Sequence, residues 1–191
     1  MKINQYPSQA ELKALFDYNL ETGILTYKVR RSNKVNIGDI AGWKYGKGYL
    51  AVTLSNKHYR VHRIVWIMSY GDIPDGYQID HINHNKLDNR LENLRLATNS
   101  ENQCNKPIIK TNKSGVKGLS DVINAWACEV EVRRNNTRFR KKKSFPFTES
   151  TKETQKEVAI AWLEHTRAEL HGEFTNHGTI NTPPTPSIQM L

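Results

Sequence analysis

The 191-residue sequence predicts an α+β fold made of short elements in two small domains. Three observations indicate this. Helix-start signals of the capping-box type occur at residues 8–11, 98–101 and 150–153. Runs with the alternation of strands lie between these signals, and a polar, asparagine-rich stretch at residues 82–93 separates two short apolar runs. With 37% hydrophobic residues, the chain can bury small cores only.

The first part of the chain predicts a helix, a strand and a hairpin. After Ser8, the spacing of apolar residues predicts a helix over residues 9–18. Residues 23–29 follow a Glu-Thr-Gly turn and have the composition of a strand. Two further runs, 49–54 and 59–61, flank a Ser-Asn-Lys turn and therefore predict a hairpin.

The middle of the chain predicts a helix followed by a ββα unit. The apolar run over residues 61–70 indicates the helix, which glycines and a proline then end. A short strand over 78–80 enters the stretch 82–93, which is too polar for the core and is predicted to be a loop. A strand over 94–96 and a capped helix that contains Asn102 complete the unit.

The last part predicts a second, separate module. Residues 106–118 have the character of a linker. Trp126 to Val132 alternate as a strand does, Asn135-Asn136 predicts a turn, and residues 137–147 predict a partner strand rich in cations. The third capping box then opens a helix, and the proline-containing tail from Asn176 is expected to be disordered.

Charge and composition narrow the function. The formal net charge is +9, and residues 107–145 hold ten Lys/Arg against three Asp/Glu, which indicates a polyanionic partner. The two cysteines form no CxxC pair, so no structural zinc and no disulfide framework are expected. Without a signal peptide or a run of about 20 apolar residues, the sequence predicts a cytoplasmic protein with no membrane partner.

The chemistry of the ββα unit centres on Asp80, His81 and Asn102. A carboxylate and an amide oxygen are ligands that Mg²⁺ accepts, and a neighbouring histidine is a base with a pKa near neutrality. Together they suit phosphodiester hydrolysis. Because successive strand residues point to opposite sides, this hypothesis requires a bend directly after Asp80, which Asn83 and Asn85 would favour.

These residues give the segment a specific resemblance. Residues 62–106, including Asp80-His81, the Asn93-Leu94 pair and the Ser-Glu-Asn of the capped helix, resemble the HNH endonuclease family, in its phage and intron-encoded branch. The resemblance implies a ββα-metal finger in which His81 is the general base, Asp80 and Asn102 hold one Mg²⁺ or Mn²⁺ ion, and Asn93 braces the loop through backbone bonds.

Other residues of the loop leave alternatives open. His81 and His84 have an H-x-x-H spacing that a zinc site could use, but a contact with DNA phosphate or a plain surface position also fits His84. His62 is expected to be packed in the core, with a substrate contact as the alternative. The candidate DNA contacts of this loop are His84, Asn85, Lys86 and Arg90.

The basic module has a resemblance of its own. Residues 114–175, with Ser114-Gly115-Val116, Trp126, a basic hairpin and a closing helix, resemble the AP2-type DNA-binding domain, which has a three-stranded sheet and a helix. Trp126 and Trp162 suit its core better than base stacking. A solvated charged face is the alternative interpretation of the hairpin. The candidate DNA contacts are Arg133, Arg134, Arg138, Arg140, Lys141, Lys142 and Lys143.

The expected organisation follows from both resemblances. It comprises a supporting α+β segment at 1–60, an HNH core at 61–106, a linker at 107–113, an AP2-like domain at 114–175 and a tail at 176–191. We expect a metal-dependent endonuclease of phage or homing type that nicks or cuts double-stranded DNA. A monomer is favoured and would nick, whereas a double-strand cut would need dimerisation or a second binding event. The alternative is a DNA-binding regulator or packaging accessory whose HNH unit no longer cuts.

Overall fold

The computed structural model describes residues 6–108, 111–134 and 137–176. Contacts divide the chain into two compact units. Among the described residues, the first comprises 6–97 and the second comprises 98–108, 111–134 and 137–176. Each unit has its own buried apolar cluster, so each is described by itself.

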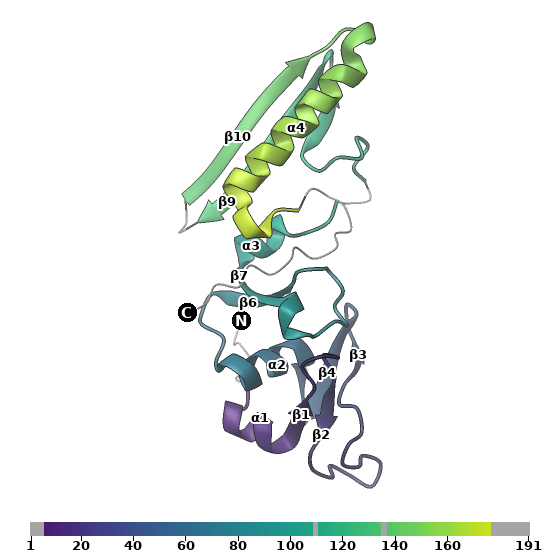
Figure 1. Cartoon of the computed structure of the whole chain (residues 1–191), viewed down its shortest axis with the longest axis vertical. Helices are drawn as coiled ribbons and strands as arrows, with labels where there is room; N and C mark the ends of the chain where they lie inside the picture. The colour runs from purple at the N-terminus through teal and green to yellow at the C-terminus, as the bar shows by residue number, and fades with distance from the viewer. Residues whose placement is uncertain (1–5, 109–110, 135–136, 177–191) are drawn as a thin grey trace. The chain divides into compact units, whose positions relative to one another are not determined.

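The first unit packs two helices against short antiparallel strands (Figure 1). Strands β1 and β2 form one hairpin, β3, β4 and β5 form a three-stranded sheet, and β6 pairs with β7. The elements are α1 (Gln9–Leu15), β1 (Phe16–Tyr18), β2 (Leu25–Tyr27), β3 (Trp43–Tyr45), β4 (Tyr49–Leu54), β5 (Lys57–Arg60), α2 (Val61–Tyr70), β6 (Tyr77–His81), a 3₁₀ turn (Leu91–Asn93) and β7 (Leu94–Thr98).

The three-stranded sheet has one face in the core and one face outside it. Val52, Leu54 and Tyr59 belong to the buried cluster together with Leu12 of α1 and Ile64 of α2. The pairing register places the alternate residues on the other face of the sheet. These residues are Trp43, Tyr45, Tyr49, Ala51, Thr53, His58 and Arg60.

The first helix is shorter than the sequence predicts. The Ser8–Glu11 capping box forms as expected, but α1 ends at Leu15 and Phe16–Tyr18 becomes strand β1. The helical spacing of Phe16 is overridden because its strand pairs with Leu25–Tyr27 and its ring is buried. The sequence analysis predicts neither strand β1 nor strand β3.

The second unit is a helix laid along a three-stranded sheet. The sheet order is β10-β9-β8, and α4 runs along one of its faces (Figure 1). The elements are α3 (Asn99–Cys104), β8 (Leu119–Val122), β9 (Ala125–Arg134), β10 (Thr137–Pro146), a 3₁₀ turn (Glu149–Thr151), α4 (Lys152–His171) and a 3₁₀ turn (Gly172–Phe174).

The core of this unit lies between the sheet and α4. Trp126, Cys128 and Val130 of β9 are buried with Ala159 and Leu163 of α4. Trp126 is thus a core residue, as expected, and Trp162 packs against the same cluster. The unit therefore consists of a sheet of three strands covered by one helix.

Several expected boundaries differ. The capping box predicted at Ser150 does not form: Thr148 caps the 3₁₀ turn Glu149–Thr151, where its backbone N–H donates to the hydroxyl of Thr151 at 2.8 Å, and the N-cap of α4 is Thr151. The contacts divide the chain after Ala97, upstream of the linker expected at 107–113. Asn176, expected to begin the tail, is buried, whereas the rest of the tail and the Asn135-Asn136 turn lie outside the described residues.

Among the described residues, none of the helices has the length and apolarity that crossing a membrane requires.

Candidate active site

Asp80 and His81 are the last two residues of β6, and both are buried, with 7% and 5% of their surface exposed. The strand continues through His81, and the chain turns only afterwards, where the N–H of His84 donates to the carbonyl of His81 at 3.1 Å. The bend expected directly after Asp80 is therefore wrong, because the turn comes one residue later, after His81. Both side chains are buried, and they meet different partners.

The Asp80 carboxylate is held by a guanidinium. Nε and Nη2 of Arg95, on the neighbouring strand β7, each lie 3.1 Å from Oδ2 of Asp80. Both side chains are nearly buried, so the ion pair offsets the cost of desolvating the carboxylate. The acid is therefore oriented by β7, which the sequence does not indicate.

The His81 imidazole is held by Asn89. Nε2 of His81 lies 3.3 Å from Oδ1 of Asn89, and Nδ2 of Asn89 donates to the carbonyl of Leu87 at 3.4 Å, which fixes the orientation of the amide. An amide oxygen only accepts, so Nε2 of His81 carries the proton in this pair. Burial lowers the pKa of His81 below its usual 6.5, and the bond to Asn89 partly offsets the effect.

Two aromatic side chains complete the surroundings of His81. The ring of His62, from α2, packs edge-on against it with centroids 4.9 Å apart, and Tyr49 of β4 lies 6.0 Å away. His62 is buried as expected, and burial holds its pKa well below the usual value. His62 therefore packs against the candidate base as an uncharged ring.

Asn93 fixes the shape of the loop through the backbone. Its Oδ1 accepts from the N–H of Asn83 at 2.9 Å, and its Nδ2 donates to the carbonyl of Asp88 at 2.8 Å. Its own carbonyl accepts from the N–H of Ile82 at 2.9 Å. These are the contacts that a loop-bracing role requires. Asn85 also serves the turn, because its Oδ1 accepts from the N–H of Leu87.

The first hairpin supports the same loop. The Tyr18 hydroxyl of β1 donates to the carbonyl of Asn89 at 3.0 Å. Gly23, at φ +71°, packs so closely that a Cβ there would lie 2.6 Å from the N of Arg90. The segment at residues 1–60 thus holds in place the residue that orients His81, a role that the sequence does not reveal.

The candidate DNA contacts of the loop differ in how far they are engaged. Arg90 forms ion pairs with Asp88 at 2.8 Å and Glu92 at 2.6 Å. Its hydrogen bonds lower the pKa of Asp88. His84 sits in the turn with φ +63°. Lys86 lies over the ring of Tyr49, 4.8 Å from its centroid.

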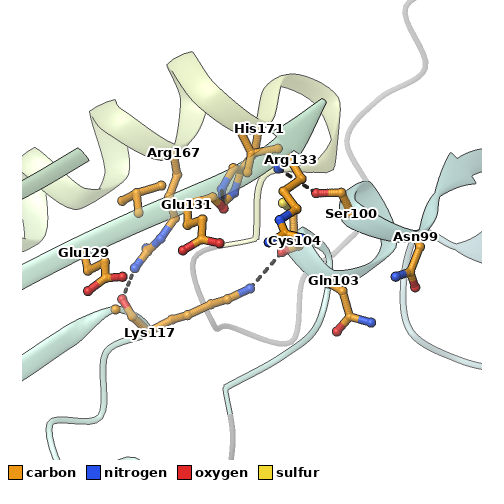
Figure 2. Close-up of a pocket in the computed structure, with 13 residues that line it drawn as sticks. Asn99, Ser100, Gln103, Cys104, Lys117, Glu129, Glu131, Arg133, Arg167 and His171 are labelled. Carbon is orange, nitrogen blue, oxygen red and sulfur yellow. Dashed lines mark hydrogen bonds between the residues drawn. The ribbon is translucent and has the colours of Figure 1, made fainter. Parts of the chain in front are cut away.

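Asn102 lies on α3 in the second unit, where its helix is firmly packed. The Thr98–Glu101 capping box opens α3 as predicted, and Oγ of Ser100 accepts from the N–H of Arg133 at 2.8 Å. Nζ of Lys117 donates to the carbonyls of Cys104 and Lys106, both at 2.7 Å (Figure 2). Because it is buried there, the pKa of Lys117 falls to about 8.

A cavity of about 390 Å³ lies beside α3 within the second unit. Figure 2 shows Arg167 and His171 of α4 on its wall, with Glu129 and Glu131 of β9. Arg167, which is buried, donates to the carbonyl of Lys117 and so holds the segment before β8. None of the predicted catalytic residues lies on this wall.

The seven basic residues of the second unit divide between the two faces of the sheet. Register places Arg133, Arg138, Arg140 and Lys142 on the face away from α4. Lys141 pairs with Glu169 of α4 at 2.6 Å, Arg134 donates to the carbonyl of Leu170, and Lys143 lies over the ring of Phe145. The last three therefore belong to the helix side.

Comparisons with known proteins identify the same segment. A family model described as HNH endonuclease matches residues 59–104, which include Asp80, His81, Asn93 and Asn102. Protein 3.8 of Escherichia phage T7 is 41% identical over 116 residues, which cover 60% of this chain and 87% of that protein.

Two further relatives carry the family name. The uncharacterized HNH endonuclease L560 of Acanthamoeba polyphaga mimivirus is 39% identical over 41% of this chain and 42% of its own length, so the chain spans less than half of it. The solved HNH homing endonuclease I-HmuI aligns with 87% of this chain and 91% of its own, at 18% identity and a TM-score of 0.39. This chain therefore matches the HNH endonuclease family model over residues 59–104 and is similar to relatives that carry the family name.

Proposed function

We propose that the chain is a divalent-metal-dependent DNA endonuclease, in which His81 is the general base and Asp80 and Asn102 hold the ion. The observation that carries this proposal is the buried Asp80–His81 pair, in which each side chain has its own orienting partner. A buried acid and a buried base, both fixed in position, suit catalysis better than a mobile surface pair does.

The histidine would act through Nδ1. Since Nε2 of His81 donates to Asn89, its other ring nitrogen is the proton acceptor. It would take a proton from a water molecule that attacks the phosphorus, and the bond from phosphorus to the 3′ oxygen would break. The products would be a 5′-phosphate and a 3′-hydroxyl, with solvent supplying the proton for the leaving oxygen.

The donor set fits a hard cation. Asp80 provides a carboxylate oxygen and Asn102 an amide oxygen, which suit Mg²⁺ or Mn²⁺ with water as the remaining ligands. When bound, such an ion would stabilise the charge on the leaving oxygen. Within the described residues, no group of three or more His, Cys, Asp or Glu side chains is arranged to hold a metal. Asn102 is assigned from its place in the motif.

We further propose that the second unit is the DNA-binding module, as its resemblance to AP2-type domains implies. Its sheet face away from α4 carries Arg133, Arg138, Arg140 and Lys142, which would meet the duplex. Arg134, Lys141 and Lys143, which lie on the helix side, would contribute less.

The second candidate function is a DNA-binding protein that does not cut. The Asp80–Arg95 ion pair favours it, since a buried carboxylate held by a guanidinium can have a structural role. Plasmid nicking separates the two candidates. We expect the wild-type chain to nick supercoiled plasmid with Mg²⁺ and not with EDTA, and His81→Ala to lose nicking while it still binds DNA. Absence of cleavage on every DNA tested would establish the non-cutting candidate.

A further inference from the structure

The outer face of the sheet β3-β4-β5 carries a continuous series of aromatic rings and cations. Trp43 lies 5.1 Å from Tyr45 and 5.5 Å from His58, and Tyr45 lies 4.8 Å from His58, measured between ring centroids. The guanidinium of Arg60 lies 5.2 Å from the centroid of Tyr45 and 4.6 Å from that of Tyr49. We name this surface the aromatic strip: Trp43, Tyr45, Tyr49, His58, Arg60 and Lys86.

The strip leads to the candidate active site. Lys86 covers the ring of Tyr49 and donates from Nζ to the carbonyl of Lys47 at 2.9 Å. Tyr49 in turn packs 5.2 Å from His62 and 6.0 Å from His81. All of these residues belong to the first unit, so the path from Trp43 to His81 is one continuous set of contacts.

The strip is partly exposed and free of negative charge. Trp43 is 46% exposed and His58 is exposed, whereas large aromatic residues usually lie inside. Residues 40–71 contain five Lys/Arg and no Asp or Glu. Within the described residues, neither Arg60 nor Lys86 forms an ion pair with a carboxylate, whereas Arg138 and Arg140 of the second unit pair with Glu131 and Glu129.

We propose that the aromatic strip binds the DNA backbone beside the phosphate on which His81 acts. The proposal rests on the nuclease function proposed above for the role of His81. Cations without a carboxylate partner would neutralise phosphates, and exposed rings would pack against sugars, which is the combination that nucleic-acid surfaces use. The strip thus gives the first unit a DNA contact of its own.

The test measures how DNA affinity depends on salt. Wild-type chain, Lys86→Gln and Lys57→Gln would be titrated into a labelled duplex by fluorescence anisotropy, with EDTA present and salt varied. Lys57 is the matched control, because β5 directs it to the opposite face from His58 and Arg60. Each phosphate contact adds about 0.9 to the slope of log affinity against log salt. We expect the slope to fall by about one for Lys86→Gln and to stay unchanged for Lys57→Gln.

Two further variants guard against misfolding. Arg60→Gln should lower the slope of log affinity against log salt by about one. Arg60→Lys, which keeps the charge, should retain most of the wild-type slope. Trp43→Ala should weaken binding with no change in slope, because its contact is not ionic. Circular dichroism would check that each variant folds.

The outcomes distinguish this proposal from the nuclease assignment. If Lys86→Gln and Arg60→Gln match Lys57→Gln in slope and affinity, the strip does not bind DNA, even where the wild-type chain cleaves. If the slopes fall as expected while no DNA is ever cut, the strip is a binding surface and the nuclease assignment fails instead.

Discussion

The amide oxygen of Asn89 faces Nε2 of His81 at 3.3 Å, and both side chains are buried. This bond fixes both the tautomer and the ring position of the candidate base. We predict that Asn89→Ala lowers the nicking rate by about 10- to 100-fold, since a misplaced base costs this much, with little change in DNA affinity. Single-turnover nicking assays would measure it. Leu87→Ala, which changes an exposed side chain in the same loop, should stay near wild type.

His62 lies edge-on to His81, and within the described residues its buried Nδ1 has no hydrogen-bond partner. We predict that His62→Phe keeps the packing, removes an unsatisfied polar atom and raises the free energy of unfolding by about 1 kcal/mol. Urea unfolding would check this. Nicking should persist, and its loss would show that His62 takes part in the reaction rather than supporting the ring.

Gly23 touches the backbone of Asn89 and Arg90, whereas a Cβ added at Gly38, which also has positive φ, would meet no described residue within 4 Å. We predict that Gly23→Ala destabilises the chain by about 1–3 kcal/mol more than Gly38→Ala, because the added methyl group collides with backbone. Thermal unfolding of the two variants measures the difference. Gly23→Ala should also slow nicking, since the displaced segment carries Asn89. Equal melting temperatures of the two variants would contradict a close contact between Gly23 and the loop that carries Asn89.

His171 is buried in the second unit, where desolvation lowers its pKa to about 4. As the pH falls below the unfolded value of about 6.5, the unfolded chain gains a proton that the folded chain does not. Stability is thus retained above pH 6.5 and lost as the pH falls toward 4. We predict a loss of about 2 kcal/mol between pH 7 and pH 5. In urea unfolding, His171→Gln should reduce this pH dependence, and an unchanged dependence would rule His171 out as its source.

Lys142 and Lys143 are neighbours on β10 that face opposite sides of the sheet. Lys142 shares its face with Arg140, while Lys143 lies over Phe145 on the side of α4. We predict that Lys142→Gln lowers the salt slope of DNA binding by about one and that Lys143→Gln leaves it unchanged. Anisotropy titrations would measure both. Equal effects would contradict binding by the face away from α4.

Sequence patterns predict much of the fold because they are local. The capping boxes at Ser8 and Thr98, the hairpin of β4 and β5, and the ββα order around Asp80 all depend on residues close together in the chain. The helix predicted to include Phe16 is wrong there because helical spacing is local, whereas the strand pairing of Phe16 with Tyr27 is not.

The sequence predicts the proposed catalytic residues of the candidate site, but not the residues that orient them. Asp80 and His81 stand out as a motif, but Arg95 and Asn89 reach them through the pairing of β6 with β7 and through the path of the loop. Asn89 is one of several asparagines in that loop, and nothing in the sequence distinguishes it. The aromatic strip likewise depends on register across three strands, which no single stretch of sequence contains.

The contacts that hold α3 determine which segments would have to be exchanged together if the second unit were replaced. Lys117, Asn176 and Arg133 hold the short helix that carries Asn102, and all three lie downstream of it. If the second unit were replaced from residues 107–113 onward, this helix would keep its own sequence but lose Lys117, Arg133 and Asn176, which hold it. A replacement that begins just before Thr98 would transfer the helix together with these residues. A graft that keeps this helix on its own supports would therefore bring Asn102, the proposed metal ligand, from the donor of the second unit.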